Sequence, residues 1–200
     1  MARKYELKRR AEKQEETRRR ILEATVEMHE ALGPARTSIS AIAEKAGVQR
    51  LTVYRHFPDE RALFYACTGH YMGANPPPDP SSWTRIGDSE GRLRLALAEV
   101  YAYHRRTESM MSKVIRDAPS HPLTRELVEP YFQHWERMRG VLAVGWGVRG
   151  KKRELLLAAI GHALDFQSWQ SLARQQGLAD ERVVELMAGM VRCAISGVRP

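Results

Sequence analysis

Apolar residues recur at three- and four-residue spacing along most of the chain, which is the period of an amphipathic α-helix. The first clear case covers 16–32, where charged residues fill the positions between the apolar ones. Gly33 and Pro34 end this pattern, because glycine accepts a reversed turn and proline cannot continue a helix. The apolar stripe consists of Ile21, Leu22, Thr25, Met28 and Leu32.

The same period returns from about residue 88 and continues to Val198 near the end of the chain. Prolines at 119 and 122 interrupt it, as do glycines at 145, 147, 150 and 177. A helical pattern throughout predicts an all-α fold. The predicted helices of this region cover 90–106, 109–116, 123–144, 151–176 and 180–198.

The stretch 37–61, TSISAIAEKAGVQRLTVYRHFPDER, predicts two short helices joined by a tight turn. Gly47 directly follows the apolar face of the first helix and tolerates the positive φ that such a turn requires. Val53 and Phe57 lie one turn apart, so they point inward together and leave the polar positions of the second helix outward. This is the layout of a helix-turn-helix, whose second helix contacts bases in the major groove of DNA.

The outward residues of the second helix have the chemistry of DNA contacts. Arg50 can pair with O6 and N7 of guanine, and Gln49 can pair with adenine. Thr52 can meet a thymine methyl group or a phosphate, and Arg55 can contact either a base or a phosphate.

The stretch resembles the DNA-binding motif of the TetR (tetracycline repressor) family, without gaps from about Thr17 to Leu63. The resemblance implies an N-terminal three-helix, helix-turn-helix DNA-binding domain followed by a helical-bundle regulatory and dimerisation domain. The matching residues are Thr37, Ile42, Ala43, Ala46-Gly47-Val48, Thr52, Val53-Tyr54, His56-Phe57 and Ala62-Leu63.

The resemblance also implies roles for single residues. Tyr54 and His56 match positions that grip the DNA backbone in the family, and Thr37 matches a position that touches a phosphate. Thr37 or Ser38 is equally expected to cap the following helix, because a hydroxyl can satisfy a free N–H group at a helix start.

Three positions depart from the family pattern, and one of them is Gln49, which stands where serine is frequent. Leu51 stands where a small residue is usual, which favours apolar contact with thymine methyl groups. Glu60 stands where the family has a phosphate-binding lysine, so that role is not carried over. Arg61, one position along, is a candidate replacement, and Asp59 is expected to cap the next helix.

A proline-rich stretch, Gly73–Ser82, is incompatible with a helix and predicts a domain boundary. We therefore expect a basic arm and DNA-binding domain over 1–73, with the motif at about 38–57. A connection over 74–87 and a ligand-binding and dimerisation domain over 88–200 follow.

Charge supports a nucleic-acid partner. The formal net charge is +8, and residues 1–20 contain nine lysines or arginines and four glutamates. A basic arm beside a helix-turn-helix suggests contacts with phosphates, whose counterions are released on binding. The arm either extends the first helix or is flexible, and a merely solvated terminus remains an alternative.

The last two predicted helices mix wide apolar faces with small residues, which permit close helix approach. From the residues alone, such faces fit a monomer core or an intersubunit bundle. The resemblance favours a homodimer through these two helices, and a dimer suits a palindromic operator. The small residues are Ala158, Ala159, Ala163, Ala188, Gly189, Ala194 and Gly197.

Aromatic and methionine side chains on neighbouring helices are candidates for the lining of a small-molecule pocket, although such residues also fill ordinary cores. An effector of this pocket is expected to be small and largely apolar. His104, His134 and His162 lack the spacing of metal ligands, so we expect no metal and no cofactor. The candidates are Tyr101, His104, Met110, Met111, Tyr131, Trp135, Phe166 and Trp169.

Other classes of protein fit the sequence less well. It has no run of 18 apolar residues and no phosphate-binding loop or nucleophile motif, so we expect neither a membrane protein nor an enzyme. The charged N-terminus lacks an apolar stretch, so we expect no secretory signal. Cys67 and Cys193 are expected to be reduced thiols in a cytoplasmic protein.

The sequence thus indicates a dimeric transcriptional regulator, a repressor released from a palindromic operator by a small ligand. Two alternatives stay open: a constitutive DNA-binding protein without an effector pocket, and an interaction scaffold that has lost DNA binding.

Overall fold

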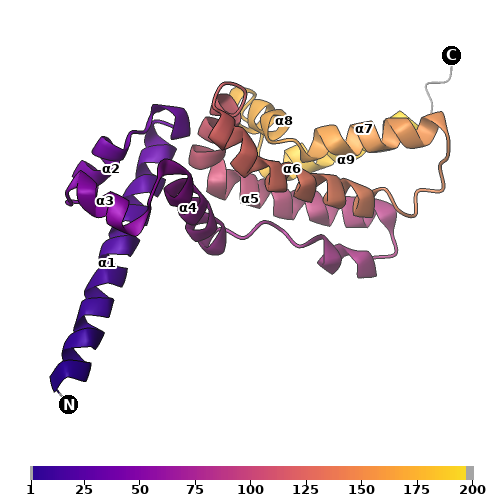
Figure 1. The fold of residues 1–200 in the computed structure, drawn as a ribbon. Coiled ribbons are helices and arrows are strands. Elements are labelled where there is room, and N and C mark those ends of the chain that lie inside the picture. Colours follow the sequence, from indigo (N-terminus) through magenta and orange to yellow (C-terminus); the bar gives the residue numbers. More distant parts are fainter. Residues whose placement is uncertain (1, 197–200) are drawn as a thin grey trace. The chain divides into compact units, whose positions relative to one another are not determined.

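The computed structural model describes residues 2–196, and within this range the chain forms helices and no strand (Figure 1). The predicted all-α fold is confirmed, whereas Val198 and Gly197 lie outside the described residues. The α-helices are α1 (Ala2–Ala31), α2 (Ile39–Lys45), α3 (Arg50–His56), α4 (Glu60–Ala74), α5 (Ser89–Asp117), α6 (Pro122–Leu142), α7 (Lys151–Leu164), α8 (Phe166–Gln170) and α9 (Asp180–Ser196).

The helices are divided between two compact units. The head unit consists of the chain up to Pro76 together with Glu108–Val128. The body unit consists of Pro77–Thr107 and the chain from Glu129 onward. Helices α5 and α6 therefore each contribute one part to the head unit and the other to the body unit.

The core of the head unit forms where helices α1 to α4 meet. Ile21, Ile42 and Leu63, one from each of three helices, have no exposed surface. Leu123 and Leu127 of α6 pack against this core. The segment around α6 is thus part of the hydrophobic packing of the head unit, and not only a link to the rest of the chain.

Two side-chain caps fix where the short helices of the head unit begin. The Ser38 hydroxyl accepts a hydrogen bond of 3.2 Å from the N–H of Ala41 and so caps α2. The Asp59 carboxylate accepts one of 2.7 Å from the N–H of Ala62 and caps α4, as predicted. Each bond satisfies a backbone donor that has no partner inside its helix.

Helix α5 is unbroken from Ser89 to Asp117, so the prediction of separate helices over 90–106 and 109–116 is wrong. The polar residues at the supposed break are satisfied within the helix, because the Thr107 hydroxyl donates to the Tyr103 carbonyl at 2.9 Å. The helix therefore continues through a point where polar residues interrupt its apolar stripe.

The predicted single helix over 151–176 is also wrong. Helix α7 ends at Leu164, and Asp165 has extended backbone angles of φ −68° and ψ 135°. The Asp165 carboxylate accepts the N–H of Ser168 at 2.7 Å and so starts α8. A π-helical turn over Ser171–Gln175 follows. The aspartate stops one helix and caps the next.

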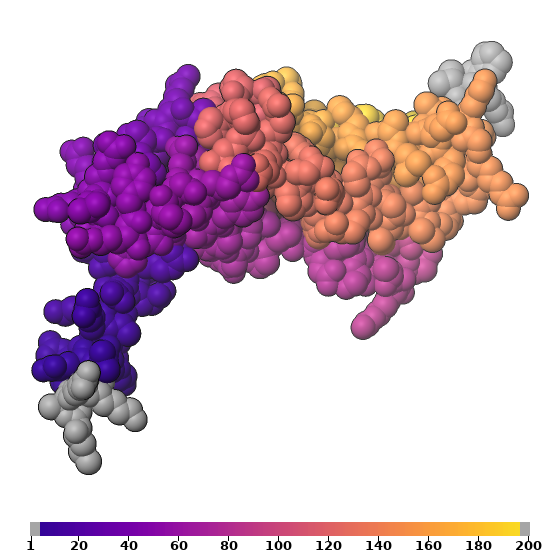
Figure 2. All heavy atoms as spheres, viewed as in Figure 1, coloured from indigo at the N-terminus to yellow at the C-terminus, as the bar shows by residue number. Residues whose placement is uncertain are grey.

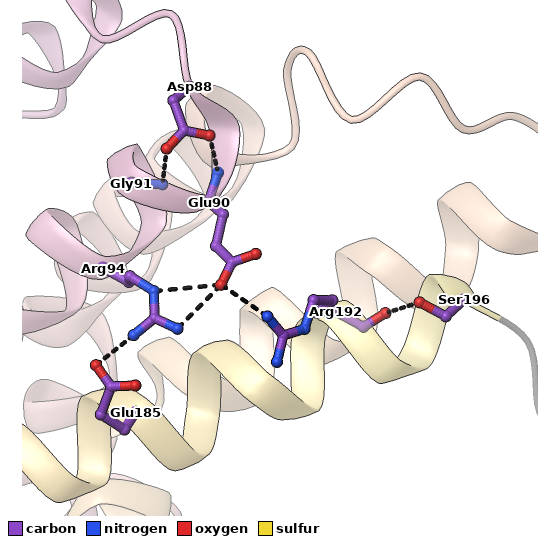
Figure 3. Close-up of polar contacts among 7 residues, drawn as sticks. All are labelled: Asp88, Glu90, Gly91, Arg94, Glu185, Arg192 and Ser196. Atoms are coloured by element: carbon purple, nitrogen blue, oxygen red, sulfur yellow. Dashed lines mark hydrogen bonds and ion pairs between the residues drawn. The ribbon is translucent and has the colours of Figure 1, made fainter.

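In the body unit, a cluster of charged side chains joins the start of α5 to α9 (Figure 3). Glu90 accepts from Arg94 at 2.9 Å and from Arg192 at 3.3 Å, and Arg94 also pairs with Glu185. Asp88 caps α5 by accepting the N–H of Gly91 at 2.8 Å. Exposed ion pairs contribute about 0–1 kcal/mol each, so the cluster mainly fixes which turns of α5 and α9 lie opposite each other.

Candidate nucleic-acid interface

Helix α3 has one buried edge and one exposed face. Val53 is 1% exposed and Phe57, at the end of the helix, is 2% exposed, so this pair fixes α3 on the core of the head unit. The predicted DNA-contacting residues occupy the opposite face. Thr52 and His56 are half-buried at its edges, whereas the exposed positions are Gln49, Arg50, Leu51, Tyr54 and Arg55.

The turn between α2 and α3 has the backbone that the sequence predicts. Gly47 has φ 63°, a value that other residues rarely adopt. The N–H of Val48 then donates to the carbonyl of Ala43 at 2.9 Å, which closes the turn on the end of α2. This turn brings α3 back against α2 with its polar face outward.

Two exposed residues of α3 support each other. The Arg50 guanidinium donates to the Tyr54 hydroxyl at 3.2 Å, and its carbon lies 5.5 Å from the centre of the Tyr54 ring. These residues are one helical turn apart on the exposed face. The contact limits the rotamers of both side chains, so less conformational entropy is lost when they meet a ligand.

The two hydroxyls before α2 have different environments. Thr37 is buried, and its hydroxyl donates to the Gly33 carbonyl at 2.8 Å. Ser38 is exposed and uses its oxygen as the cap acceptor, which leaves its O–H free to donate outward. Of the two, the Ser38 hydroxyl is the one that a phosphate can reach without rearrangement.

Arg61 already has an acidic partner. Its guanidinium pairs with Glu126 of α6, and the Tyr65 hydroxyl donates to the same carboxylate. The donors lower the pKa of Glu126, with the hydrogen bond from Tyr65 the largest cause. Arg61 remains 60% exposed, so it can bind a phosphate only by leaving or sharing Glu126.

A groove of about 670 Å³ lies between α1 and α3, and sequence reasoning did not foresee it. The Arg18 guanidinium of α1 lies over the ring of Phe57, 4.5 Å from its centre, and this contact joins α1 to the end of α3. The residues that line the groove are Arg10, Ala11, Lys13, Gln14, Glu15, Thr17 and Arg18 of α1, with Thr52, Arg55 and His56 of α3.

Residues 21–67, which contain α2, α3 and most of α4, match the family model described as bacterial regulatory proteins of the tetR family. The matched segment is a TetR-type DNA-binding domain. Among curated proteins, none matches the chain by sequence.

Solved structures of transcriptional regulators share the fold over nearly the whole chain. A TetR-like transcriptional regulator from Rhodococcus sp. RHA1 has a TM-score of 0.65 at 18% identity and covers 91% of this chain and 97% of its own. PfmR from Thermus thermophilus has a TM-score of 0.61 at 17% identity, with 90% and 96% covered. FadR from Bacillus subtilis, in complex with stearoyl-CoA, has a TM-score of 0.60 at 17% identity, with 90% and 98% covered.

In the body unit, six of the predicted pocket residues form one aromatic cluster that includes His104. The His104 ring centre lies 5.4 Å from Trp135, 5.4 Å from Phe166 and 5.7 Å from Trp169. Tyr131 packs edge-on to Trp135 at 4.9 Å. The sixth, Tyr101, donates from its hydroxyl to the carbonyl of Ala163 at 2.9 Å.

His104 is the polar centre of the cluster. Its Nε2 lies 3.0 Å from the Leu164 carbonyl, and since a carbonyl only accepts, Nε2 carries the proton. Burial lowers the pKa of His104 to about 4, so the ring is neutral at pH 7. Its Nδ1 is then a buried acceptor, for which residues 2–196 supply no partner.

The two predicted methionines lie in the other unit. Met110 and Met111 are each 6% exposed and belong to the head-unit part of α5. Within the described range, no group of three or more histidine, cysteine or acidic side chains is arranged to hold a metal ion. No helix of that range is long and apolar enough to cross a membrane.

Proposed function

We propose that the chain is a dimeric repressor of the TetR family, which binds a palindromic operator through α3 and is released by a small, largely apolar ligand. The observation that carries the proposal is the exposed polar face of α3, fixed on the core by Val53 and Phe57. A short helix so fixed can enter a major groove as a rigid element.

The roles of the residues on and near α3 follow from the chemistry of their side chains. Arg50 and Gln49, at its start, contact base edges, and Leu51 contacts thymine methyl groups. Tyr54 and His56 contact the sugar-phosphate backbone of the DNA, and the residues before α2 contact it as well. Arg61 contacts it if it leaves Glu126. In this proposal 1–73 bind DNA, 74–87 connect, and 88–200 bind the ligand and dimerise.

Dimerisation through α7 and α9 is supported by apolar side chains that these helices leave exposed. The two helices pack against each other in the body unit. Leu155 on α7 is 53% exposed, and Leu186 and Met190, one turn apart on α9, are 45% and 40% exposed. A second copy that covers these side chains would remove them from water and place two α3 helices on one DNA.

The ligand site is proposed at the aromatic cluster around His104. Buried rings with unpartnered polar atoms, among them Nδ1 of His104 and the hydroxyl of Tyr131, suit an apolar molecule that carries a few hydrogen-bonding groups. The FadR structure, which shares the fold, holds stearoyl-CoA, a ligand with a long apolar acyl chain. Ligand binding in the body unit would lower DNA affinity by favouring a conformation with the wrong spacing of the two α3 helices.

The test is selection of double-stranded DNA from a random library by the full-length protein, followed by affinity measurements on the selected site. Arg50→Ala should weaken binding about 10- to 100-fold and relax the sequence preference at one base pair. Arg149→Ala removes the same charge from an exposed loop and should change affinity little. If no sequence is enriched, the proposed function is wrong.

A further inference from the structure

Helix α1 is longer than the fold of the head unit requires. Every residue from Tyr5 to Glu16 is exposed, and burial begins only at Thr17. In Figures 1 and 2 this first part of α1, in indigo, extends beyond α2, α3 and α4. The family match starts later still, at residue 21. Residues 5–16, which we call the arm, are therefore not explained by packing.

Three ion pairs lie on one face of α1, over the arm and the turns that follow it, whereas Glu6 lies one turn before Arg10 on the other face. Lys8 pairs with Glu12 at 3.8 Å, and Arg19 pairs with Glu16 at 2.7 Å and with Glu23 at 2.8 Å. These pairs neutralise one side of the helix surface.

The cations of the other side have no such partner. Within residues 2–196, no carboxylate forms an ion pair with Arg10, Lys13 or Arg18. Arg10, Lys13 and Thr17 follow at three- and four-residue spacing, so they share a face.

That face forms one wall of the groove, and α3 forms the other. The groove has four cationic side chains, Arg10, Lys13, Arg18 and Arg55, against the single carboxylate of Glu15. Its remaining polar lining, from glutamine, threonine and histidine, consists of hydrogen-bond donors and acceptors. Such a lining suits a sugar-phosphate chain and is unsuited to an apolar ligand.

We infer that this groove receives one phosphodiester strand of the DNA beside the segment that α3 contacts, with the arm following that strand. The inference rests on the proposed DNA-binding function and adds a second surface to it. The arm of twelve residues is about 18 Å long, enough to pass several phosphates of one strand. Arg55, which chemistry alone leaves undecided, is assigned to the phosphate strand and not to a base.

The experiment compares two double variants with equal change in charge. Arg10→Gln/Lys13→Gln removes two cations from the groove, whereas Lys8→Gln/Arg19→Gln removes two from the neutralised side. Affinity for the selected operator is measured from 0.05 to 0.3 M salt. The groove variant should bind about tenfold or more weakly near 0.15 M, and its salt slope should fall by about 1 to 2. The control variant should keep a slope close to that of the wild type.

Arg55→Gln should weaken binding equally on the operator and on an unrelated duplex of the same length, as expected for a phosphate contact. Helix content from circular dichroism must be unchanged in all variants, and glutamine is a good helix former. A further double variant of the groove, Arg10→Glu/Lys13→Glu, should lose more DNA affinity than the glutamine variant.

The outcomes separate the two ideas. If the wild type enriches no DNA, the proposed function fails. If Arg50→Ala alters sequence preference but both glutamine variants give equal slopes, only the groove inference is overturned. Inorganic phosphate serves as a probe of a small-anion site: if it raises the melting temperature through Arg10 and Lys13 while DNA affinity does not depend on them, the inference is also overturned.

Discussion

Two histidines in this protein are held neutral by burial, one in each unit. His29 of the head unit packs edge-on to Phe64 at 4.6 Å and lies 4.0 Å from the sulfur of Cys67. Burial is the main reason that the pKa of His29 falls to about 4, the same value as for His104. Both rings must be desolvated on folding, and desolvation favours the form without charge.

These histidines should make folding sensitive to mild acid. In the unfolded chain these histidines take up a proton near pH 6.5, whereas in the folded chain they stay neutral down to about pH 4. The unfolded state therefore binds more protons in this window, and the free energy of unfolding falls as pH drops from 6.5 to 4. The full effect is about 3 kcal/mol for each histidine, and above pH 7 it vanishes.

Urea unfolding from pH 5 to 7.5 measures this dependence. His104→Phe should reduce the slope of the unfolding free energy against pH, whatever its effect on stability at pH 7.5. Replacement of the exposed His70 by glutamine is the control and should leave the slope unchanged. An identical slope for His104→Phe and the wild type would contradict the assignment.

Single residues differ in how far the sequence reveals their role. Gly47, Val53 and Asp59 could be predicted because each meets a local demand: a positive φ, an inward position or a free N–H group. The ion pair of Arg61 could not be predicted, because its partner Glu126 lies 65 residues further along the chain. Only folding brings them together.

At the scale of elements, the turn between α2 and α3 depends on the backbone freedom of one glycine. Gly47→Ala should destabilise the protein by about 1 kcal/mol, because φ 63° is unfavourable for alanine although its Cβ would meet no atom within 4 Å. Gly69→Ala is the matched control. It lies in the exposed middle of α4, also without neighbours, and should stabilise by about 0.5–1 kcal/mol.

Thermal and urea unfolding of both variants checks this pair. A loss of stability in both would show that a methyl group is not tolerated in the head unit for reasons other than φ. Opposite signs are the expected result.

Helix boundaries show where periodicity is a poor guide. The apolar stripe weakens near Thr107, yet α5 continues because the backbone bonds there are intact. The stripe persists through Asp165, yet α7 stops because that carboxylate caps α8 instead. The groove between α1 and α3 could not be predicted at all, because it depends on the crossing of two helices that the sequence places apart.

At the scale of the whole molecule, the proposed function depends on a second copy of the chain. Leu155→Arg/Met190→Arg should abolish the dimer, because both side chains are exposed on α7 and α9 and burial of unpaired charge is costly. Sedimentation should then report a monomer, with affinity for the palindromic operator at least tenfold lower.

Val144→Arg replaces an apolar side chain that is 62% exposed in the loop after α6, and it should leave the protein dimeric. A double variant that sediments as the wild type does would exclude this interface. Loss of the dimer in Val144→Arg as well would instead assign the interface to the loop.

The composition of the head unit limits how this chain can be divided or recombined with another protein. Glu108–Val128 comes late in the chain but supplies Leu123 and Leu127 to the head core. It also supplies Asp117, whose carboxylate accepts the N–H of Ala35 at 3.0 Å. A chimera that exchanges only the first 76 residues with another regulator would pair a new core with foreign packing partners. To transfer DNA-binding specificity between two such proteins, the first 76 residues and Glu108–Val128 must therefore be exchanged together.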